Sequence, residues 1–337
     1  MEKGILERPL AKASGLLLGL LLLLACMLVS VVYGVINTDW HTMIEAYTNF
    51  NGSNEHIVIR ETRVPRSIIA VAIGINLGIA GSILQALTRN PIGDVGIFGI
   101  NGAASFAIVC SVGFFGANSM HALTWAGFTG ALLGGIAVYI LGSIGRDGMT
   151  PLKMTLAGAA LTALFSSFTN GILVTNEQAL EEVLFWLAGS VADRKLSYLI
   201  EVLPFMIAAW ILALLLAPAI NTFMLGEDVA KGLGQRTLLL KLGMGFVVII
   251  LSGCSVAVAG PIGFVGLFTP HLARYLTGND MKWTILYSGL FGGILLVISD
   301  ILARAIAMPQ ELPIGVMTAL FGAPFFIYII RKGMLRS

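Results

Sequence analysis

The stretch SGLLLGLLLLLACMLVSVVYGVI, residues 14–36, contains no charged residue. An apolar run of about 20 residues is long enough to cross the hydrocarbon core of a bilayer as a helix. The preceding MEKGILERPLAKASG is basic, as the start of a signal peptide would be, but no small-residue cleavage site follows closely. We therefore expect a retained first membrane helix whose N-terminus lies in the cytoplasm.

The composition of the whole chain is that of a membrane protein. Of the 337 residues, 57% are hydrophobic and only 11% are charged, against about 25% charged in soluble domains. The net charge of +2 is too small to indicate a nucleic-acid partner, whereas membrane lipid can cover the apolar surface. Cys26, Cys110 and Cys254 all lie in apolar runs, which favours packing residues over a disulfide framework.

Further apolar segments recur along the chain and predict an all-α fold. They cover residues 65–88, 95–116, 122–145, 151–174, 196–217, 238–259, 283–303 and 312–330, with a half-length helix at 263–276 and an amphipathic piece at 179–189. No soluble domain interrupts them, so residues 1–337 are expected to form a single transmembrane domain. We predict a polytopic membrane bundle of about ten transmembrane helices, with the N- and C-termini both cytoplasmic.

The distribution of basic residues supports this orientation, because lysine and arginine gather in short cytoplasmic loops. Under the predicted topology most of the 20 Lys and Arg residues lie inside. The exceptions are Arg60, Arg63, Arg66, Arg194, Lys195 and Arg304. The first three crowd the start of segment 65–88, so the outer end carries a basic cluster that needs an explanation of its own.

The motifs expected of an enzyme are missing. The sequence has no G-x-x-x-x-G-K-[ST] phosphate loop and no H-E-x-x-H, and its four histidines are scattered. We therefore expect no catalytic site, cofactor or metal in this chain. Asp300 lies one helical turn before Arg304, which favours a local ion pair over a buried proton relay. The densest polar run within a span is expected to face a pathway or a neighbouring helix; it comprises Ser166, Ser167, Thr169 and Asn170.

Two stretches between the spans leave alternatives open. LTRNPIGDVGIFGINGA, residues 87–103, interrupts the apolar pattern with proline and glycine. It is either a turn that lines a pore or an ordinary interhelical loop. MLGEDVAKGLGQRTL, residues 224–238, is short and amphipathic: Leu225, Val229 and Leu233 recur every four residues, and glycines break the helix after them. This segment can dock in the groove of a partner protein or lie on its own bundle.

Five stretches, taken in order, resemble the FecCD family of binding-protein-dependent ABC permeases, the transmembrane subunits of iron–siderophore, haem and cobalamin importers. They are RVPRSIIAVAIG, LTRNPIGDVGIFGINGA, LGEDVAKGLG, AVAGPIGFVGLFTPHLAR and SDILARAIAMPQELPIGVMTALFGAPFF. The resemblance covers nearly the whole chain. It departs from the family after PHLARYLTG, where Asp280 is kept but Met281 and Lys282 stand in place of a common His-Arg pair.

The resemblance implies roles for three groups of residues. Arg63, Arg66 and Arg304 match arginines that meet acidic residues of a substrate-binding protein, and we add Arg60 because it lies beside them. The alternative is that these arginines anchor the helix at the lipid headgroups. The turn formed by Asn90, Pro91 and Ile92 resembles a cytoplasmic gate. The cytoplasmic segment 224–238 resembles a helix that couples to the ATPase, through Leu225, Gly226, Glu227, Asp228, Ala230, Leu233 and Gly234.

The resemblance also implies a function and its partners. We expect the permease subunit of an ABC importer in the inner membrane of a bacterium, with ferric siderophores as cargo and haem or cobalamin as alternatives. The expected partners are two ATP-binding subunits on separate chains, a second permease that is identical or related, and an extracytoplasmic binding protein that is periplasmic or a lipoprotein. Outside the family, the alternative is a secondary transporter driven by an ion gradient, which would need coupling-ion ligands near the midplane.

Overall fold

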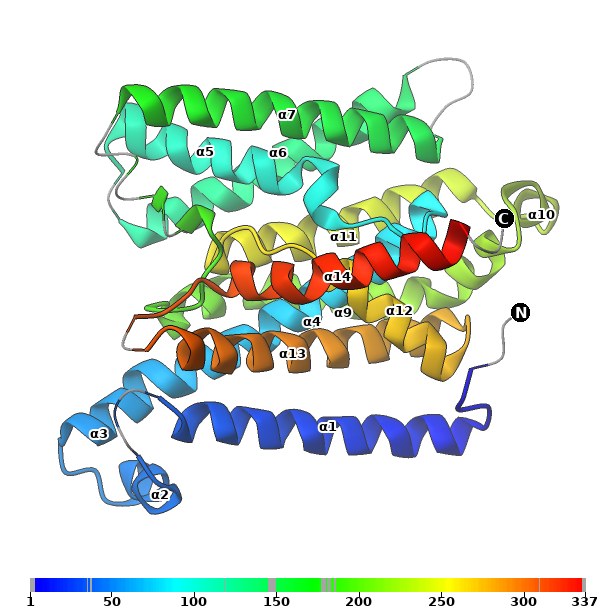
Figure 1. Cartoon of the computed structure of the whole chain (residues 1–337). Coiled ribbons are helices and arrows are strands. Elements are labelled where there is room, and N and C mark those ends of the chain that lie inside the picture. The colour runs from blue at the N-terminus through cyan, green and yellow to red at the C-terminus, as the bar shows by residue number, and fades with distance from the viewer. Residues whose placement is uncertain are drawn as a thin grey trace.

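The computed structural model describes residues 4–334 apart from residues 35, 37, 118, 145–149, 177–179, 181–182, 185 and 309. Every element within these residues is a helix, which confirms the all-α prediction (Figure 1). The long helices are α1 (Pro9–Val32), α4 (Val64–Thr88), α5 (Ile100–Phe115), α6 (Met120–Ser143), α7 (Pro151–Thr175), α9 (Leu196–Met224), α11 (Thr237–Ala259), α13 (Met281–Ile306) and α14 (Ile314–Met334). The shorter ones are α2 (Trp40–Thr48), α3 (Asn54–Ile57), the π-helix η1 (Val58–Arg63), the 3-10 helix η2 (Val95–Phe98), α10 (Glu227–Gly232) and α12 (Val265–Thr277).

The helices agree with the hydropathy pattern of the sequence. Seven of the described helices are long and apolar enough to cross a membrane, and two shorter apolar helices, Ile100–Phe115 and Ile314–Ile327, accompany them. The predicted half-length helix at 263–276 is α12, which has 13 residues. In the amphipathic piece predicted at 179–189, residues 180, 183–184 and 186–187 are helical, and residues 179, 181, 182 and 185 lie outside the described part of the chain.

Three boundaries differ from the sequence prediction. α9 continues to Met224, although the segment was expected to end before Pro218. The hydrocarbon core of a bilayer holds no water that could form hydrogen bonds with an unwound backbone. A helix that crosses it is therefore more stable when it continues through an internal proline than when it unwinds there. α1 ends at Val32, before the expected Ile36. Segment 95–116 is divided at Gly99, whose φ of 75° separates η2 from α5.

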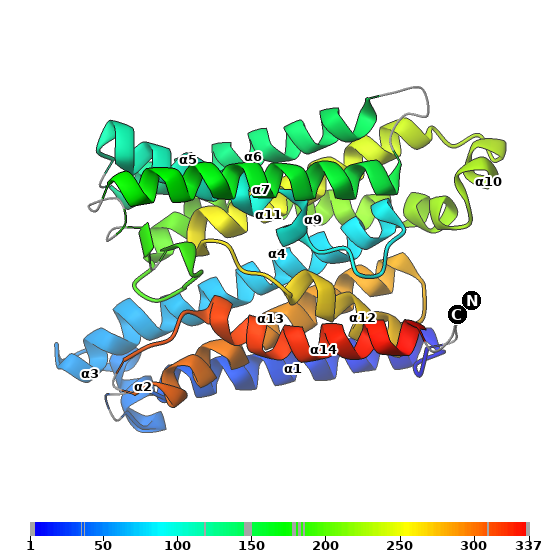
Figure 2. The same cartoon turned by 45° about the horizontal axis from the view of Figure 1, so that its top comes forward.

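The helices form two groups on either side of a central pair, α4 and α11 (Figures 1 and 2). α5, α6 and α7 pack together on one side, and α1, α12, α13 and α14 lie on the other. The start of α1, α10 and the last turn of α14 share one end of the bundle, called here the α10 end. α2 and α3 lie at the opposite end, the α2 end. That the α10 end is cytoplasmic stays a prediction.

Glycine lets α4 and α13 approach each other backbone to backbone. A Cβ atom built on Gly74 would overlap the backbone of Gly292, and one built on Gly78 would overlap the carbonyl oxygen of Ser288. Small residues at helix crossings allow tight packing in lipid, where no hydrophobic drive acts between helices. Gly130 of α6 meets α5 in the same way. The crossing of α4 and α13 therefore depends on the absence of side chains.

We expect Gly78→Ala to destabilise the bundle, because the added methyl group collides with backbone of α13 that cannot move aside. Overpacking of this kind costs about 1–3 kcal/mol. Gly171→Ala on α7 is the matched control, since nothing lies within 4 Å of a Cβ atom built there. The thermal midpoint of the purified protein in detergent should fall for G78A and hold or rise for G171A. Equal midpoints for the two variants would contradict the close crossing.

Candidate functional site

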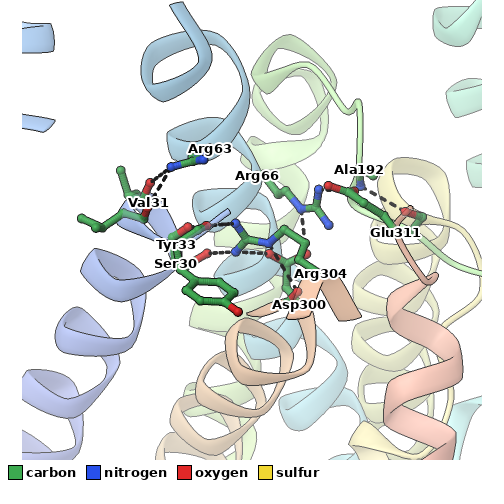
Figure 3. Close-up of polar contacts among 11 residues, drawn as sticks. Ser30, Val31, Tyr33, Arg63, Arg66, Ala192, Asp300, Arg304 and Glu311 are labelled. Carbon is green, nitrogen blue, oxygen red and sulfur yellow. Dashed lines mark hydrogen bonds and ion pairs between the residues drawn. The ribbon is translucent and has the colours of Figure 1, made fainter. Parts of the chain in front are cut away.

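A buried aspartate at the α2 end of the bundle binds two arginines (Figure 3). The side chain of Asp300, on α13, is fully buried. Its Oδ1 accepts a hydrogen bond from Nε of Arg66 at 2.7 Å, and its Oδ2 accepts one from Nη2 of Arg304 at 2.9 Å. The pair predicted between Asp300 and Arg304 is therefore confirmed, and Arg66 of α4 joins it. One carboxylate thus makes two charge-assisted hydrogen bonds, of which the bond from Arg66 links α4 to α13 and the bond from Arg304 stays within α13.

Arg304 and Arg63 bind the C-terminal end of α1 (Figure 3). Arg304 donates to the carbonyl oxygens of Ser30 at 3.1 Å and Tyr33 at 2.6 Å. Arg63 donates to the carbonyl oxygens of Val31 and Val32 at 3.0 and 2.9 Å. The last carbonyls of a helix have no partner within it and carry a partial negative charge. The two guanidinium groups supply these partners and so stabilise the end of α1.

Arg66 also binds a second carboxylate, which is in contact with water. Its Nη1 donates to Oε2 of Glu311 at 2.6 Å. The side chain of Glu311 is 36% exposed, whereas that of Arg66 is 5% exposed. Glu311 lies in the segment between α13 and α14, so this ion pair holds that segment against α4. We call Arg63, Arg66, Asp300, Arg304 and Glu311 the arginine network.

The structure places the four predicted docking arginines in two different environments. Arg63, Arg66 and Arg304 are only 5%, 4% and 4% exposed, and their guanidinium groups bind the protein itself. A headgroup anchor has to be exposed, so the burial of these three side chains argues against that alternative. Arg60, on η1, is exposed and stacks over the rings of Tyr47 and Phe50 at 5.4 and 4.8 Å. Their role in docking stays a prediction.

The segment predicted to couple to an ATPase projects from the α10 end. The side chains of Leu225, Val229 and Leu233 are 60%, 49% and 69% exposed, and only Ala230 of this segment is fully buried. The apolar stripe is therefore uncovered in this chain, and its role in coupling to an ATPase stays a prediction. Gly226 and Gly234 flank α10 with φ values of 134° and 78°. The remaining predicted residue, Asp228, is exposed.

An ion pair fixes α10 to the start of α11. Oε2 of Glu227 lies 2.8 Å from Nζ of Lys241, and its Oε1 lies 3.2 Å from Nζ of Lys231. The hydrogen bond from Lys241 lowers the pKa of Glu227, so the carboxylate is charged at neutral pH. Because the side chain of Lys241 is only 10% exposed, this contact is better shielded from water than a surface ion pair.

The predicted gate residues form a tight turn beside the coupling segment. Oδ1 of Asn90 accepts the N–H of Ile92 at 3.1 Å, and the carbonyl oxygen of Asn90 accepts the N–H of Gly93 at 3.1 Å. Pro91 lines a cavity of about 300 Å³ together with Met224, the last residue of α9. The turn and the coupling segment are thus neighbours in the fold, although they lie far apart in the sequence.

The cavity beside this turn is basic. Arg89 and Arg274 both line it. Arg89 donates to the carbonyl oxygen of Phe223 at 2.9 Å, and Arg274 donates to the side chain of Gln85. These contacts tie the ends of α4, α9 and α12 together. In the part of the chain that the structure describes, no three His, Cys, Asp or Glu side chains come together as metal ligands would.

Comparison with known proteins agrees with the resemblance found in the sequence. The sequence model of the FecCD transport family matches residues 22–332. The chain is 50% identical to the probable siderophore transport system permease protein YfiZ of Bacillus subtilis (strain 168), over 93% of this chain and 94% of that protein. It is 37% identical to the ferric enterobactin transport system permease protein FepD of Escherichia coli (strain K12), over 93% of each chain.

A solved structure has the same fold. It is described as an inward-facing conformation of a metal-chelate type ABC transporter, and it superposes with a TM-score of 0.82 at 27% identity. The match covers 95% of this chain and 99% of the other. Since the family's sequence model spans nearly the whole chain and a relative is 50% identical along it, this chain belongs to the FecCD transport family.

Proposed function

We propose that this chain is the membrane-spanning permease subunit of an ABC importer that carries ferric siderophores into a bacterial cell. Membership of the FecCD family supports the class of protein, and the relatives named for siderophore and ferric enterobactin transport support the cargo. The observation that carries the proposal is the exposed apolar stripe of α10, which needs a partner to cover it. A short amphipathic helix that enters a groove of a partner is a common mode of recognition.

The proposed assembly contains chains that this one requires. ATP hydrolysis takes place on two separate cytoplasmic subunits, because the sequence has no phosphate-binding loop. A second permease, identical or related, completes the translocation path, and a binding protein delivers the cargo on the outer side of the inner membrane. In this arrangement the α10 end faces the cytoplasm and the α2 end faces outward.

The proposed cycle links the two ends of the bundle. A loaded binding protein docks at the α2 end, where Arg60 is exposed and the arginine network lies behind it. Movement of the ATPase is transmitted to α10, and the pair between Glu227 and Lys241 passes it on to α11. The gate turn at Asn90, which shares a cavity lining with Met224, then opens. The helices switch between outward- and inward-facing states as rigid bodies.

Purification from the native membrane tests the proposal. A tag on this chain, gentle extraction and an ATPase assay should yield hydrolysis together with an ATP-binding subunit and, where the permease pair is mixed, a second permease. A pure chain without ATPase, under conditions that preserve other membrane complexes, would overturn the proposal. Uptake that persists without ATP but stops when the ion gradient collapses would then favour a secondary transporter.

Replacing the exposed leucines of the coupling segment should separate the permease from the ATPase. We expect Leu225→Ser with Leu233→Ser to lower the amount of co-purified ATPase at least tenfold, because burying each leucine contributes about 1.5–3 kcal/mol. Leu10→Ser is the matched control, since Leu10 is 83% exposed on α1. Quantitative blots of the purified complex measure the ratio of ATPase to permease. An undiminished ratio in the double variant would exclude α10 as the contact.

Reversing the charge of Arg60 should slow the docking of the binding protein. We expect Arg60→Glu to lower the association rate constant about tenfold at low salt, and less at high salt, because a charge at the rim of an interface steers an acidic partner. Arg8→Glu makes the same charge change at the α10 end and should leave the rate unchanged. Surface plasmon resonance on the reconstituted transporter gives both rates, and equal effects of the two variants would contradict docking at the α2 end.

A further inference from the structure

Arg66 holds two carboxylates that differ in their access to water (Figure 3). The side chain of Asp300 is 0% exposed, and that of Glu311 is 36% exposed. Both oxygens of Asp300 are already occupied, one by Arg66 and one by Arg304. The Nη1 group of Arg66 therefore faces a carboxylate at the edge of the outer surface, while its Nε is fixed in the interior. Of the two carboxylates bound to Arg66, only that of Glu311 is exposed.

We propose that Glu311 occupies the position of an acidic side chain of the docking protein, and that docking exchanges one carboxylate for the other on Nη1 of Arg66. This inference rests on the proposed function, because it requires a binding protein that presents an aspartate or glutamate at the α2 end. It reconciles the family-derived role of Arg66 with the burial of its side chain. In the free permease Glu311 covers the arginine, and in the docked complex Glu311 turns toward water.

Exchange is the accessible route because simple opening is costly. A buried guanidinium that loses its partner leaves a charge unpaired in a medium of low dielectric constant. Replacing one carboxylate by another keeps the hydrogen bond and the charge balance on Arg66 throughout. A neutral or basic partner cannot make this replacement, so the exchange selects for an acidic side chain on the docking protein.

The exchange acts on the start of α14. Glu311 lies just before Pro313 and Ile314, where α14 begins. Further along, Gly322 of α14 packs against the side chain of Phe264, and the ring of Phe325 lies 4.3 Å from that of Phe268 on α12. The backbone N–H of Phe264 donates to Asp94, which follows the gate turn. Release of Glu311 therefore frees the start of α14. The rest of α14 contacts Phe264, whose backbone is bonded to Asp94 next to the gate turn.

The decisive variant is Glu311→Gln in the intact transporter, reconstituted in nanodiscs with its ATPase subunits. The probe is the binding protein that co-purifies with the wild-type complex. Glutamine competes less well for Arg66, so the dissociation constant of the binding protein should become about fivefold tighter, the scale of one partly exposed ion pair. The control is Glu61→Gln, which removes the same charge from an exposed residue of η1. E61Q should change the dissociation constant of the binding protein by less than about twofold, because salt screens the effect of a single exposed charge.

Hydrogen exchange of the peptide covering residues 310–316 provides a second readout. This peptide includes the N–H of Leu312, which donates to Ala303, and that of Gly315, which donates to Gly189. Adding the binding protein should speed exchange there in the wild type, and E311Q should exchange fast without it. Slower exchange on docking would show that Glu311 is held more firmly and would overturn the inference.

Different results would overturn the proposed function and the carboxylate exchange. If the wild-type transporter binds no extracytoplasmic protein, the proposed function falls and the exchange falls with it. If the wild type binds one and E311Q binds it equally or more weakly, only the exchange is wrong, and Glu311 is then a structural residue or a direct contact.

Discussion

The buried carboxylate of Asp300 is the interaction on which the α2 end of the bundle depends. It receives Arg66 from α4 and Arg304 from its own helix, and Arg304 continues to the last carbonyls of α1. A charge in a low-dielectric interior is tolerated only when its partners are complete, and removing one partner is strongly destabilising. Together with Arg304, the aspartate therefore joins three helices at the α2 end, beyond the glycine contacts of α4 with α13.

The two ends of the bundle prepare for partners by different physical means. At the α2 end Arg66 and Arg304 are paired within the chain, so a partner that docks there would meet ion pairs rather than bare charge. At the α10 end the stripe of Leu225, Val229 and Leu233 is uncovered. There affinity comes from removing apolar surface from water, which is non-directional and proportional to area. An exchangeable contact at the α2 end and a lasting contact at the α10 end would suit the proposed importer, whose delivery protein binds and leaves in each cycle.

Rigid links connect the exposed stripe to the gate turn. Glu227 and Lys241 fix α10 to α11, and Arg89 fixes the end of α4 to Phe223 at the end of α9. The predicted gate turn follows Arg89 directly, so the contact of Arg89 with Phe223 attaches the start of the turn to α9. The cavity between these elements gives the turn room to change conformation while the helices around it stay packed. These contacts are the route by which the proposed movement of α10 would reach the turn at Asn90.

The sequence by itself determined the long apolar helices, the glycines that end α10 and the pair between Asp300 and Arg304, because all of these follow from hydropathy, backbone preference or a spacing of one helical turn. It did not indicate the short helices α2, α3 and η1, which are not long apolar runs. It also carried the family resemblance. Only the tertiary structure decided that Arg66 meets Asp300, 234 residues away, and Glu311, 245 residues away. It also decided that Arg63 binds α1 and that the apolar stripe of α10 is exposed. No local pattern encodes these outcomes, since the partner of a charged side chain is fixed by which helix ends the packing brings together.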